Sequence, residues 1–278
     1  MRGRLKRYVC TAVGAAVGAA ALTVFLIAPG QASAQQKAPF FGANLAHRGL
    51  YRADGRIPEN SRAAFSAAAS CGYGVELDVR LTADGVPVVC HDETLRHLCG
   101  VDARVDALTL AELRRWPVRG SAEPLLRLSD ALSCIGGRVP VVLELKRARR
   151  RGALCRAVYA LLQAYSGAVC VESFDPLIVR WWRRHAPEVL RGQLSRPMSR
   201  FAGELCAPAA FALSRLLTNF LGRPQFIAYD VCGGKPMTMR LCERMGAMKF
   251  AWTCHSRAHE AENDAVIFEF YRPAPRFK

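Results

Sequence analysis

The sequence predicts a closed barrel of eight parallel β-strands surrounded by helices, with a separate segment before it. Three observations lead to this fold class. About 240 of the 278 residues remain once that segment is set aside, close to the ~250 residues of a typical (β/α)8 barrel. Nine short apolar runs alternate with helical stretches, as in parallel sheets. One connection between two of these runs is too short for a parallel crossover, which leaves eight parallel strands and one extra strand.

The segment 1–35 is predicted to lie outside the barrel domain, which we place at 42–278. It begins MRGRLKR, and no charged residue follows from 8 to 30, a run of ~20 residues that is long enough to cross a bilayer. We expect a basic cytoplasmic tail and a single transmembrane anchor. Four basic residues precede the run and only Lys37 follows it closely, so the barrel of this cell-membrane protein should lie outside the cytoplasm. The alternative is a signal peptide cleaved at the A-x-A sequence 32–34, which would make the protein secreted.

The predicted strands are short runs rich in β-branched residues, and cap signals mark the helices between them. Ser61 is expected to cap a helix over 62–70, Thr109 opens a capping box, and Asp175-Pro176 places a cap and an N1 proline before the next helix. The expected strands are 44–48, 74–79, 87–92, 139–146, 168–173, 189–194, 226–231, 248–253 and 265–269.

The second and third of these runs are separated by only seven residues, RLTADGV. This connection contains Asp84-Gly85, a hairpin-turn signal, so the two strands should pair antiparallel. The added hairpin should rise at the barrel mouth and bring His91 and Asp92 back to its rim. The long stretch from 200 to 223 is expected to be an enlarged helical crossover and not a second domain.

Carboxylates occupy strand positions that structure alone does not explain. Alternate strand residues point to opposite faces, and helices cover the outer face of a parallel barrel. The apolar residues of the second and fourth runs therefore belong outside, which turns Glu76, Asp78, Glu144 and Lys146 inward. Crowded carboxylates are costly to bury, and an all-oxygen set is typical of Mg²⁺ or Ca²⁺. We predict that Glu76, Asp78 and Glu144 bind one divalent cation; the alternative is a salt-bridge cluster with Arg80 and Lys146.

Two of the six histidines lie at predicted strand ends that face the same mouth, His47 and His91. Barrel enzymes place their chemistry at the carboxyl ends of the strands. Because histidine gains and loses a proton near neutral pH, a pair of histidines at this edge suits a general acid and a general base. The eleven cysteines show no metal-binding spacing and are expected to be mostly core thiols.

Six motifs occur in an order and spacing that resemble the glycerophosphodiester phosphodiesterase family. They are HRG at 47–49, PEN at 58–60, ELDV at 76–79, TADG at 82–85, VVCHD at 88–92 and LELK at 143–146, with ESFD at 172–175 and WT at 252–253 further on. The resemblance covers about 44–272. It implies a metal-dependent TIM-barrel hydrolase that cleaves glycerophosphodiesters to glycerol 3-phosphate and an alcohol.

The resemblance also implies residue roles. His47 and His91 would be the acid–base pair, and Glu76, Asp78 and Glu144 the ligands of the divalent cation. The substrate would be contacted by Arg48 and Lys146 at the phosphate, with Glu59, Asn60 and Trp252 as further binding or supporting residues. Two positions depart from many family members: His255 after the WTC sequence, and the IFEFYRP sequence at 267–273. Both lie on late strands, and we expect them to affect the alcohol pocket.

Composition leaves two alternatives open. The net charge is +16, with arginine far more frequent than lysine, which suits anionic partners. A phospholipase-type enzyme acting on intact lipid is one alternative, and a non-enzymatic tethered binder of anionic wall polymers is the other. No nucleic-acid-binding motif is present, so a nucleic-acid partner is not expected, and the sequence leaves the oligomeric state open.

Overall fold

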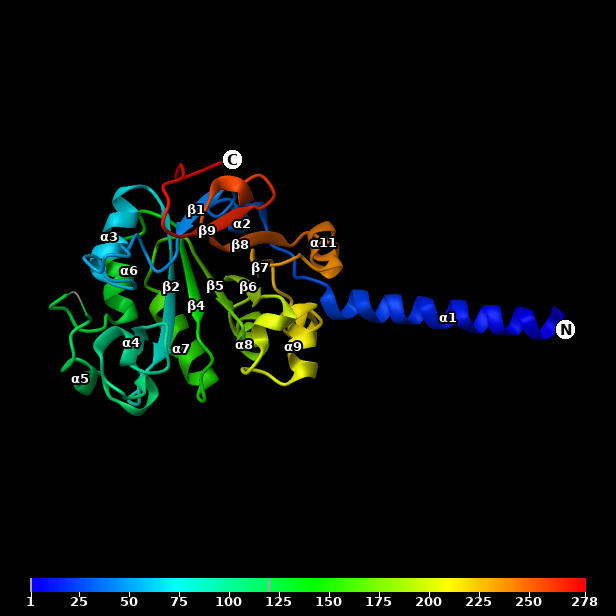
Figure 1. Ribbon diagram of the computed structural model, residues 1–278, viewed down its shortest axis with the longest axis horizontal. Helices are drawn as coiled ribbons and strands as arrows, with labels where there is room; N and C mark the ends of the chain where they lie inside the picture. The colour runs from blue at the N-terminus through cyan, green and yellow to red at the C-terminus, as the bar shows by residue number, and fades with distance from the viewer. Residues whose placement is uncertain (1, 120) are drawn as a thin grey trace.

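The computed structural model describes residues 2–119 and 121–278, with the side chains of 2–12 left undescribed. Its strands form one sheet that closes on itself (Figure 1). Eight strands pair parallel around the circle in the order β1-β2-β4-β5-β6-β7-β8-β9, and β9 returns to β1. The strands are β1 (Ala43–Ala46), β2 (Gly74–Leu81), β3 (Pro87–Val89), β4 (Val141–Leu145), β5 (Val169–Ser173), β6 (Leu190–Ser195), β7 (Phe226–Asp230), β8 (Met248–Cys254) and β9 (Ala265–Phe268).

Helices connect most of the successive parallel strands, with only a 3-10 turn between β8 and β9, and several helices begin at the predicted caps. The Ser61 side chain accepts a hydrogen bond from the Ala64 N–H at the start of α3, and Asp175 caps α8 with a proline in the first turn. The Thr109 capping box forms, but its helix ends after one turn. The helices are α1 (Arg2–Ile27), α2 (Ala34–Lys37), α3 (Arg62–Ser70), α4 (Arg96–Cys99), α5 (Leu110–Leu113), α6 (Leu128–Ile135), α7 (Arg151–Leu162), α8 (Pro176–His185), α9 (Ala207–Ser214), α10 (Asn219–Gly222) and α11 (Met237–Arg244), with 3-10 turns at Val105–Ala107, Met198–Phe201 and Arg257–His259.

The two faces of the barrel wall have separate cores, which confirms the predicted alternation. On β2 the side chains of Val75, Leu77 and Val79 pack outward with residues of the surrounding helices. Val142 and Cys170, from the two following strands, pack in the interior cluster. Because strand residues alternate, Glu144 lies on the same inner face of β4 as Val142. The inner face therefore carries the predicted carboxylates.

The predicted hairpin is present: β3 pairs antiparallel with β2, with Val79 opposite Val89. After β3 the chain returns to the barrel, where the Cys90 N–H donates to the Asp78 carbonyl over 3.0 Å. The segments 93–119 and 121–127 then form a small lobe with α4 and α5 (Figure 1) and contribute to a separate hydrophobic cluster. The hairpin thus supplies one wall of the barrel mouth, as expected.

The stretch from 200 to 223 forms an enlarged crossover that contains α9 and α10, in agreement with the prediction. Ten cysteines of the described side chains are free thiols, and half of them are buried: Cys90, Cys155, Cys170, Cys242 and Cys254.

Helix α1 extends away from the barrel, and only its end packs against it (Figure 1). Ile27 is fully buried, and the Asn219 Nδ2 group donates to its carbonyl over 3.0 Å. Arg223 Nη1 donates to the Phe25 carbonyl over 2.7 Å. In the described part of the chain, no helix has the length and apolar character needed to cross a membrane. The predicted anchor stays a prediction, because the side chains of 2–12, which include the basic tail and the start of the uncharged run, lie outside the described residues.

Candidate active site

Three carboxylates from two neighbouring strands meet inside the barrel. Asp78 on β2 lies in register with Glu144 on β4, and Glu76 lies two residues earlier on the same face of β2. One oxygen of each carboxylate lies within 4.8 Å of the others. Glu76 and Asp78 are buried and Glu144 is partly exposed. The structure thus brings together the three predicted metal ligands.

Cationic and polar side chains surround Asp78. Lys146 Nζ lies 2.7 Å from Asp78 Oδ1 and 2.6 Å from Glu144 Oε1. Arg48 Nε is 3.3 Å from Asp78 Oδ2, and Asn60 Nδ2 donates to the same oxygen over 2.8 Å. Burial alone would raise the pKa of Asp78, but the charges of Lys146 and Arg48 outweigh it and hold this pKa well below its usual range.

The other predicted cation, Arg80, does not join this cluster. Its guanidinium group donates two hydrogen bonds to the His91 carbonyl, at 2.9 and 2.7 Å. The salt-bridge alternative is therefore present only in part, through Lys146. Among the described residues, no lysine or arginine forms an ion pair with Glu76, since Lys146 lies between the other two carboxylates.

Of the three carboxylates, Glu76 is the one whose negative charge is least balanced by nearby positive groups. Its Oε2 accepts the backbone N–H of Arg48 over 3.0 Å. Burial and the neighbouring charges of Asp78 and Glu144 raise the pKa of Glu76 well above its usual value. A bound divalent cation would reduce this penalty, because its two positive charges would attract all three carboxylates at once.

A fourth buried carboxylate, Glu172, lies beside them and was not among the predicted site residues. It lies on β5, in register with Glu144 on β4. Its Oε2 is buried with no hydrogen-bond partner among the described residues. Burial and the charge of Glu144 raise its pKa well above the usual value. The alternation of β5 places Glu172 on the inner face with Cys170, so the sequence pattern could have identified it.

The HRG and PEN motifs hold each other in place. Arg48 Nη1 donates to both Glu59 oxygens, at 2.9 and 3.0 Å, and the Asn60 N–H donates to the Arg48 carbonyl over 2.9 Å. Arg48 and Asn60 adopt positive φ angles of 53° and 54°, which non-glycine residues rarely do. These contacts fix the Arg48 guanidinium group and the Asn60 amide against Asp78.

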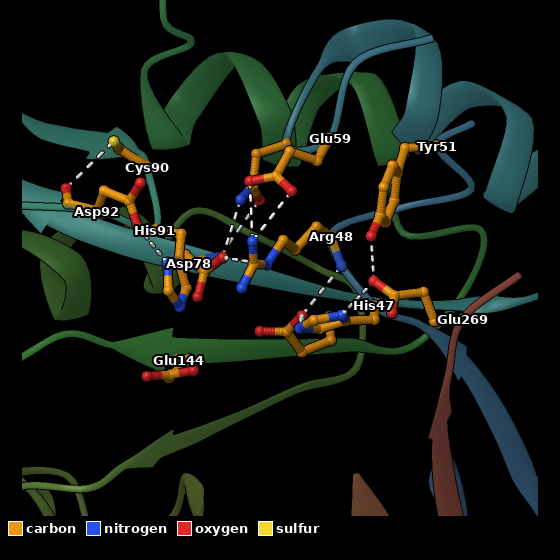
Figure 2. Close-up of polar contacts among 12 residues, drawn as sticks. His47, Arg48, Tyr51, Glu59, Asp78, Cys90, His91, Asp92, Glu144 and Glu269 are labelled. Atoms are coloured by element: carbon orange, nitrogen blue, oxygen red, sulfur yellow. Dashed lines mark hydrogen bonds and ion pairs between the residues drawn. The ribbon is translucent and has the colours of Figure 1, made fainter. Parts of the chain in front are cut away.

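His47 follows β1 and is held by a residue that we did not predict. Its Nδ1 lies 3.1 Å from Glu269 Oε1, and its Nε2 lies 3.9 Å from Glu76 Oε2. The Tyr51 hydroxyl also donates to Glu269 (Figure 2). Burial alone would raise the pKa of Glu269, but the hydrogen bonds from His47 and Tyr51 lower it. A charged Glu269 therefore orients His47 and leaves Nε2 available at the carboxylate site.

His91 is held in a comparable way on the other side of Asp78 (Figure 2). Its Nδ1 lies 2.6 Å from Asp92 Oδ1. Burial and the positive charge of Lys146 lower the pKa of His91. Both influences favour the neutral form of this imidazole, and Nε2 is its remaining nitrogen.

The two departures from many family members lie next to each other, and their effect on the alcohol pocket stays a prediction. His255 Nδ1 is 4.0 Å from Glu269 Oε2, so the two positions at which the chain differs from many family members meet beside His47. Trp252 packs edge to face on Phe174 with a ring separation of 5.6 Å. No contact among the described residues joins Trp252 to the carboxylates, and its role in substrate binding stays a prediction.

Comparisons with known proteins find relatives in one enzyme family. The model of the glycerophosphoryl diester phosphodiesterase family matches residues 47–269. Glycerophosphodiester phosphodiesterase 1 of Homo sapiens is 30% identical over 167 residues, which cover 56% of this chain and 49% of the human protein. The glycerophosphodiester phosphodiesterase of Caldanaerobacter subterraneus is 43% identical over 72 residues, or 26% of this chain and 28% of that protein. The chain thus spans half or less of the length of these curated relatives.

Solved structures share the barrel. An Oleispira antarctica phosphodiesterase in complex with the product sn-glycerol-3-phosphate superposes with a TM-score of 0.68 and 22% identity, covering 84% of this chain and 94% of that one. A glycerophosphodiester phosphodiesterase from Parabacteroides distasonis gives a TM-score of 0.64 and 22% identity over 82% and 93% of the two chains. The fold is therefore shared with these enzymes. Since the family match extends from the first site histidine to Glu269, this chain belongs to the glycerophosphoryl diester phosphodiesterase family of hydrolases.

Proposed function

We propose that the protein hydrolyses glycerophosphodiesters to glycerol 3-phosphate and an alcohol. The observation that carries the proposal is the arrangement inside the barrel mouth. Three carboxylates converge within 4.8 Å, and His47 and His91 each have Nδ1 bound to a further carboxylate. The Oleispira antarctica relative holds sn-glycerol-3-phosphate as product, which supports the same substrate class here.

The carboxylate site fits a divalent cation, Mg²⁺ or Ca²⁺. All three candidate ligands, Glu76, Asp78 and Glu144, offer oxygen, the donor atom that these hard ions prefer. The raised pKa of Glu76 and the unpartnered oxygen of Glu172 both indicate that this region holds more negative charge than Lys146 and Arg48 balance. When bound, the cation would neutralise the charge that develops on the phosphoryl oxygens.

The chain's own groups would perform the positioning and the proton transfers. Arg48 and Lys146 lie at the carboxylates and would contact the phosphate oxygens of the substrate. Their positive charges would stabilise the transition state, because it is more negatively charged than the bound substrate. One of the two histidines, His47 or His91, would accept a proton from the nucleophile through its Nε2 atom. The other would donate a proton to the leaving alkoxide. Their Nδ1 contacts with Glu269 and Asp92 hold both rings in the required orientation.

A substrate panel tests the proposal. The protein would be incubated with Mg²⁺ or Ca²⁺ and with glycerophosphocholine, glycerophosphoethanolamine, glycerophosphoglycerol and an intact phospholipid. Release of glycerol 3-phosphate from the water-soluble diesters is the expected result. Cleavage of the intact lipid alone would support the phospholipase alternative, and binding of anionic polymer without any hydrolysis would contradict the enzyme proposal.

We further propose that the barrel lies outside the cytoplasm, either attached at the cell membrane by the N-terminal segment or released from it. The support is the charge pattern, with four basic residues before the uncharged run and a single lysine soon after it. Protease treatment of intact cells should then degrade an attached barrel. A barrel that becomes sensitive only after cell lysis would contradict this placement.

A further inference from the structure

A cavity of about 530 Å³ opens beside the carboxylate site, between the β4–α7 loop and the lobe that follows β3. This volume lies within the usual range of small-molecule sites. Its lining is strongly basic, and only Glu93 and Asp106 oppose the positive charges. The six cationic side chains that line it, here called the arginine cavity, are Arg80, Arg104, Lys146, Arg147, Arg149 and Arg151.

Of the six cations of the arginine cavity, Lys146 and Arg151 are paired with carboxylates, and Arg80 donates to the His91 carbonyl. Arg104 is neutralised by Glu93 at 2.6 Å and Asp106 at 2.8 Å. By contrast, Arg147 and Arg149 are exposed and make no ion pair or side-chain hydrogen bond with the residues that the structure describes. After internal pairing, the cavity therefore keeps two guanidinium groups able to bind an anion.

The positive charge of the arginine cavity also acts on Asp106, a lining residue of the lobe. The hydrogen bonds from Arg104 lower the pKa of Asp106, and the charges of Arg149 and Arg80 lower it further. Arg149 and Arg80 come from different segments of the chain, and both act on the same carboxylate. The loop and the lobe thus enclose one electrostatic environment.

The arginine cavity adjoins the reaction site on its His91 side. Lys146 lines the cavity and also contacts Asp78 and Glu144. Arg80, another lining residue, donates to the His91 carbonyl. In Figure 2 His91 and His47 lie on opposite sides of Asp78, with Glu269 beside His47. A substrate whose phosphodiester lies at the carboxylates can therefore extend past His91 into the cavity.

We propose that the arginine cavity is a second anion subsite, which binds a phosphate group on the alcohol part of the substrate. This inference rests on the proposed function. The glycerol part of a glycerophosphodiester is uncharged, so a second anionic group must belong to the alcohol. Guanidinium groups match phosphate oxygens with paired hydrogen bonds. The protein should thus prefer diesters of phosphorylated alcohols over diesters whose alcohol is neutral or cationic.

A matched substrate pair tests the preference. The kcat/KM would be measured for glycerophosphoinositol and for the same diester with a phosphate on the inositol ring. Replacing Arg147 and Arg149 together by glutamine should lower kcat/KM for the phosphorylated substrate about tenfold, while the value for the unphosphorylated one stays within twofold. The Arg147→Lys, Arg149→Lys variant should recover part of the loss. High salt should reduce the preference, because it screens these exposed charges.

The control is the double variant Arg184→Gln, Arg244→Gln, which removes the same charge from exposed positions on α8 and α11 outside the cavity lining. It should leave both substrates unaffected. An equal loss on both substrates in the Arg147/Arg149 variant, or an equal loss in the control, would overturn the subsite.

A binding measurement separates this inference from the proposed function. Inorganic pyrophosphate would be titrated calorimetrically into the metal-free protein, with no turnover involved. Its affinity should fall at least fivefold in the Arg147/Arg149 variant and not in the control. If no diester is hydrolysed but this loss is found, the proposed function fails and the anion site stands. If diesters are hydrolysed and pyrophosphate binding does not depend on the two arginines, the subsite is wrong and the function stands.

Discussion

Replacing Glu269 by glutamine should reduce turnover through His47 and leave the carboxylate site intact. Glu269 Oε1 lies 3.1 Å from His47 Nδ1, and the two side chains are only 13% and 17% exposed. Two unit charges at this separation attract by roughly 5 kcal/mol at an effective dielectric constant of 20. Measured hydrogen bonds to charged groups contribute less, ~1.5–3 kcal/mol. Because this attraction stabilises the imidazolium form of His47 during proton transfer, kcat should fall about 10- to 100-fold.

Steady-state kinetics on a soluble glycerophosphodiester, together with calorimetric metal titration, tests this expectation. The matched control is Tyr51→Phe, which removes the other hydrogen bond to Glu269 but keeps its charge, and kcat should stay within about fivefold of wild type. Metal affinity should be unchanged in both variants. A Glu269→Gln variant with wild-type kcat, or with metal affinity lowered in parallel with kcat, would refute the role of Glu269 in orienting His47.

Three further outcomes are expected. Alanine at His47 or His91 should lower kcat by ~10²–10⁴ with metal binding retained in calorimetry; a variant within a few-fold of wild type would remove that histidine from the mechanism. The hydrogen bond from Arg127 lowers the pKa of Asp130, so Asp130→Asn should lower the urea midpoint of unfolding above pH ~4. The difference from wild type should vanish as the pH falls through the lowered pKa. A difference that does not depend on pH would contradict this expectation. Gly192→Ala should destabilise the barrel by ~1–3 kcal/mol in urea unfolding, since a Cβ there would lie 2.1 Å from an aromatic ring of β7; unchanged stability would show that the ring can move.

The sequence predicted the barrel well because its strands carry a strong period-two pattern. On β2 the apolar residues and the carboxylates alternate strictly, and only one face of a barrel strand can hold charges near the mouth. The short RLTADGV connection could only form a hairpin. These constraints are local, so neither needed knowledge of the tertiary contacts.

The contacts between distant strands could not be predicted in the same way. Glu269 reaches His47 because β9 pairs with β1, a contact across 222 residues that exists only once the barrel closes. On the sequence alone, the unusual IFEFYRP stretch was therefore assigned to the alcohol side. Glu172 was missed for a different reason, because the alternation rule was not extended to β5.

Local sequence patterns also could not predict the lobe formed by 93–119 and 121–127. Its helices have one turn each, too short for a periodic signal. Its apolar side chains pack in a small hydrophobic cluster that also contains Val88 and Cys90. The arginine cavity forms only where this lobe faces the β4–α7 loop. The run of basic residues after Lys146 was visible in the sequence, but its opposing wall was not.

The central claim is that Glu76, Asp78 and Glu144 form a metal site at which a glycerophosphodiester is hydrolysed. The most direct measurement is the rate of glycerol 3-phosphate release before chelation, after exhaustive chelation, and after Mg²⁺ or Ca²⁺ is restored. It would be repeated with Glu144→Gln, which keeps the size of the side chain and removes one ligand charge. Chelation should abolish release, the metal should restore it, and the variant should need a higher metal concentration. Full activity after chelation would contradict the central claim.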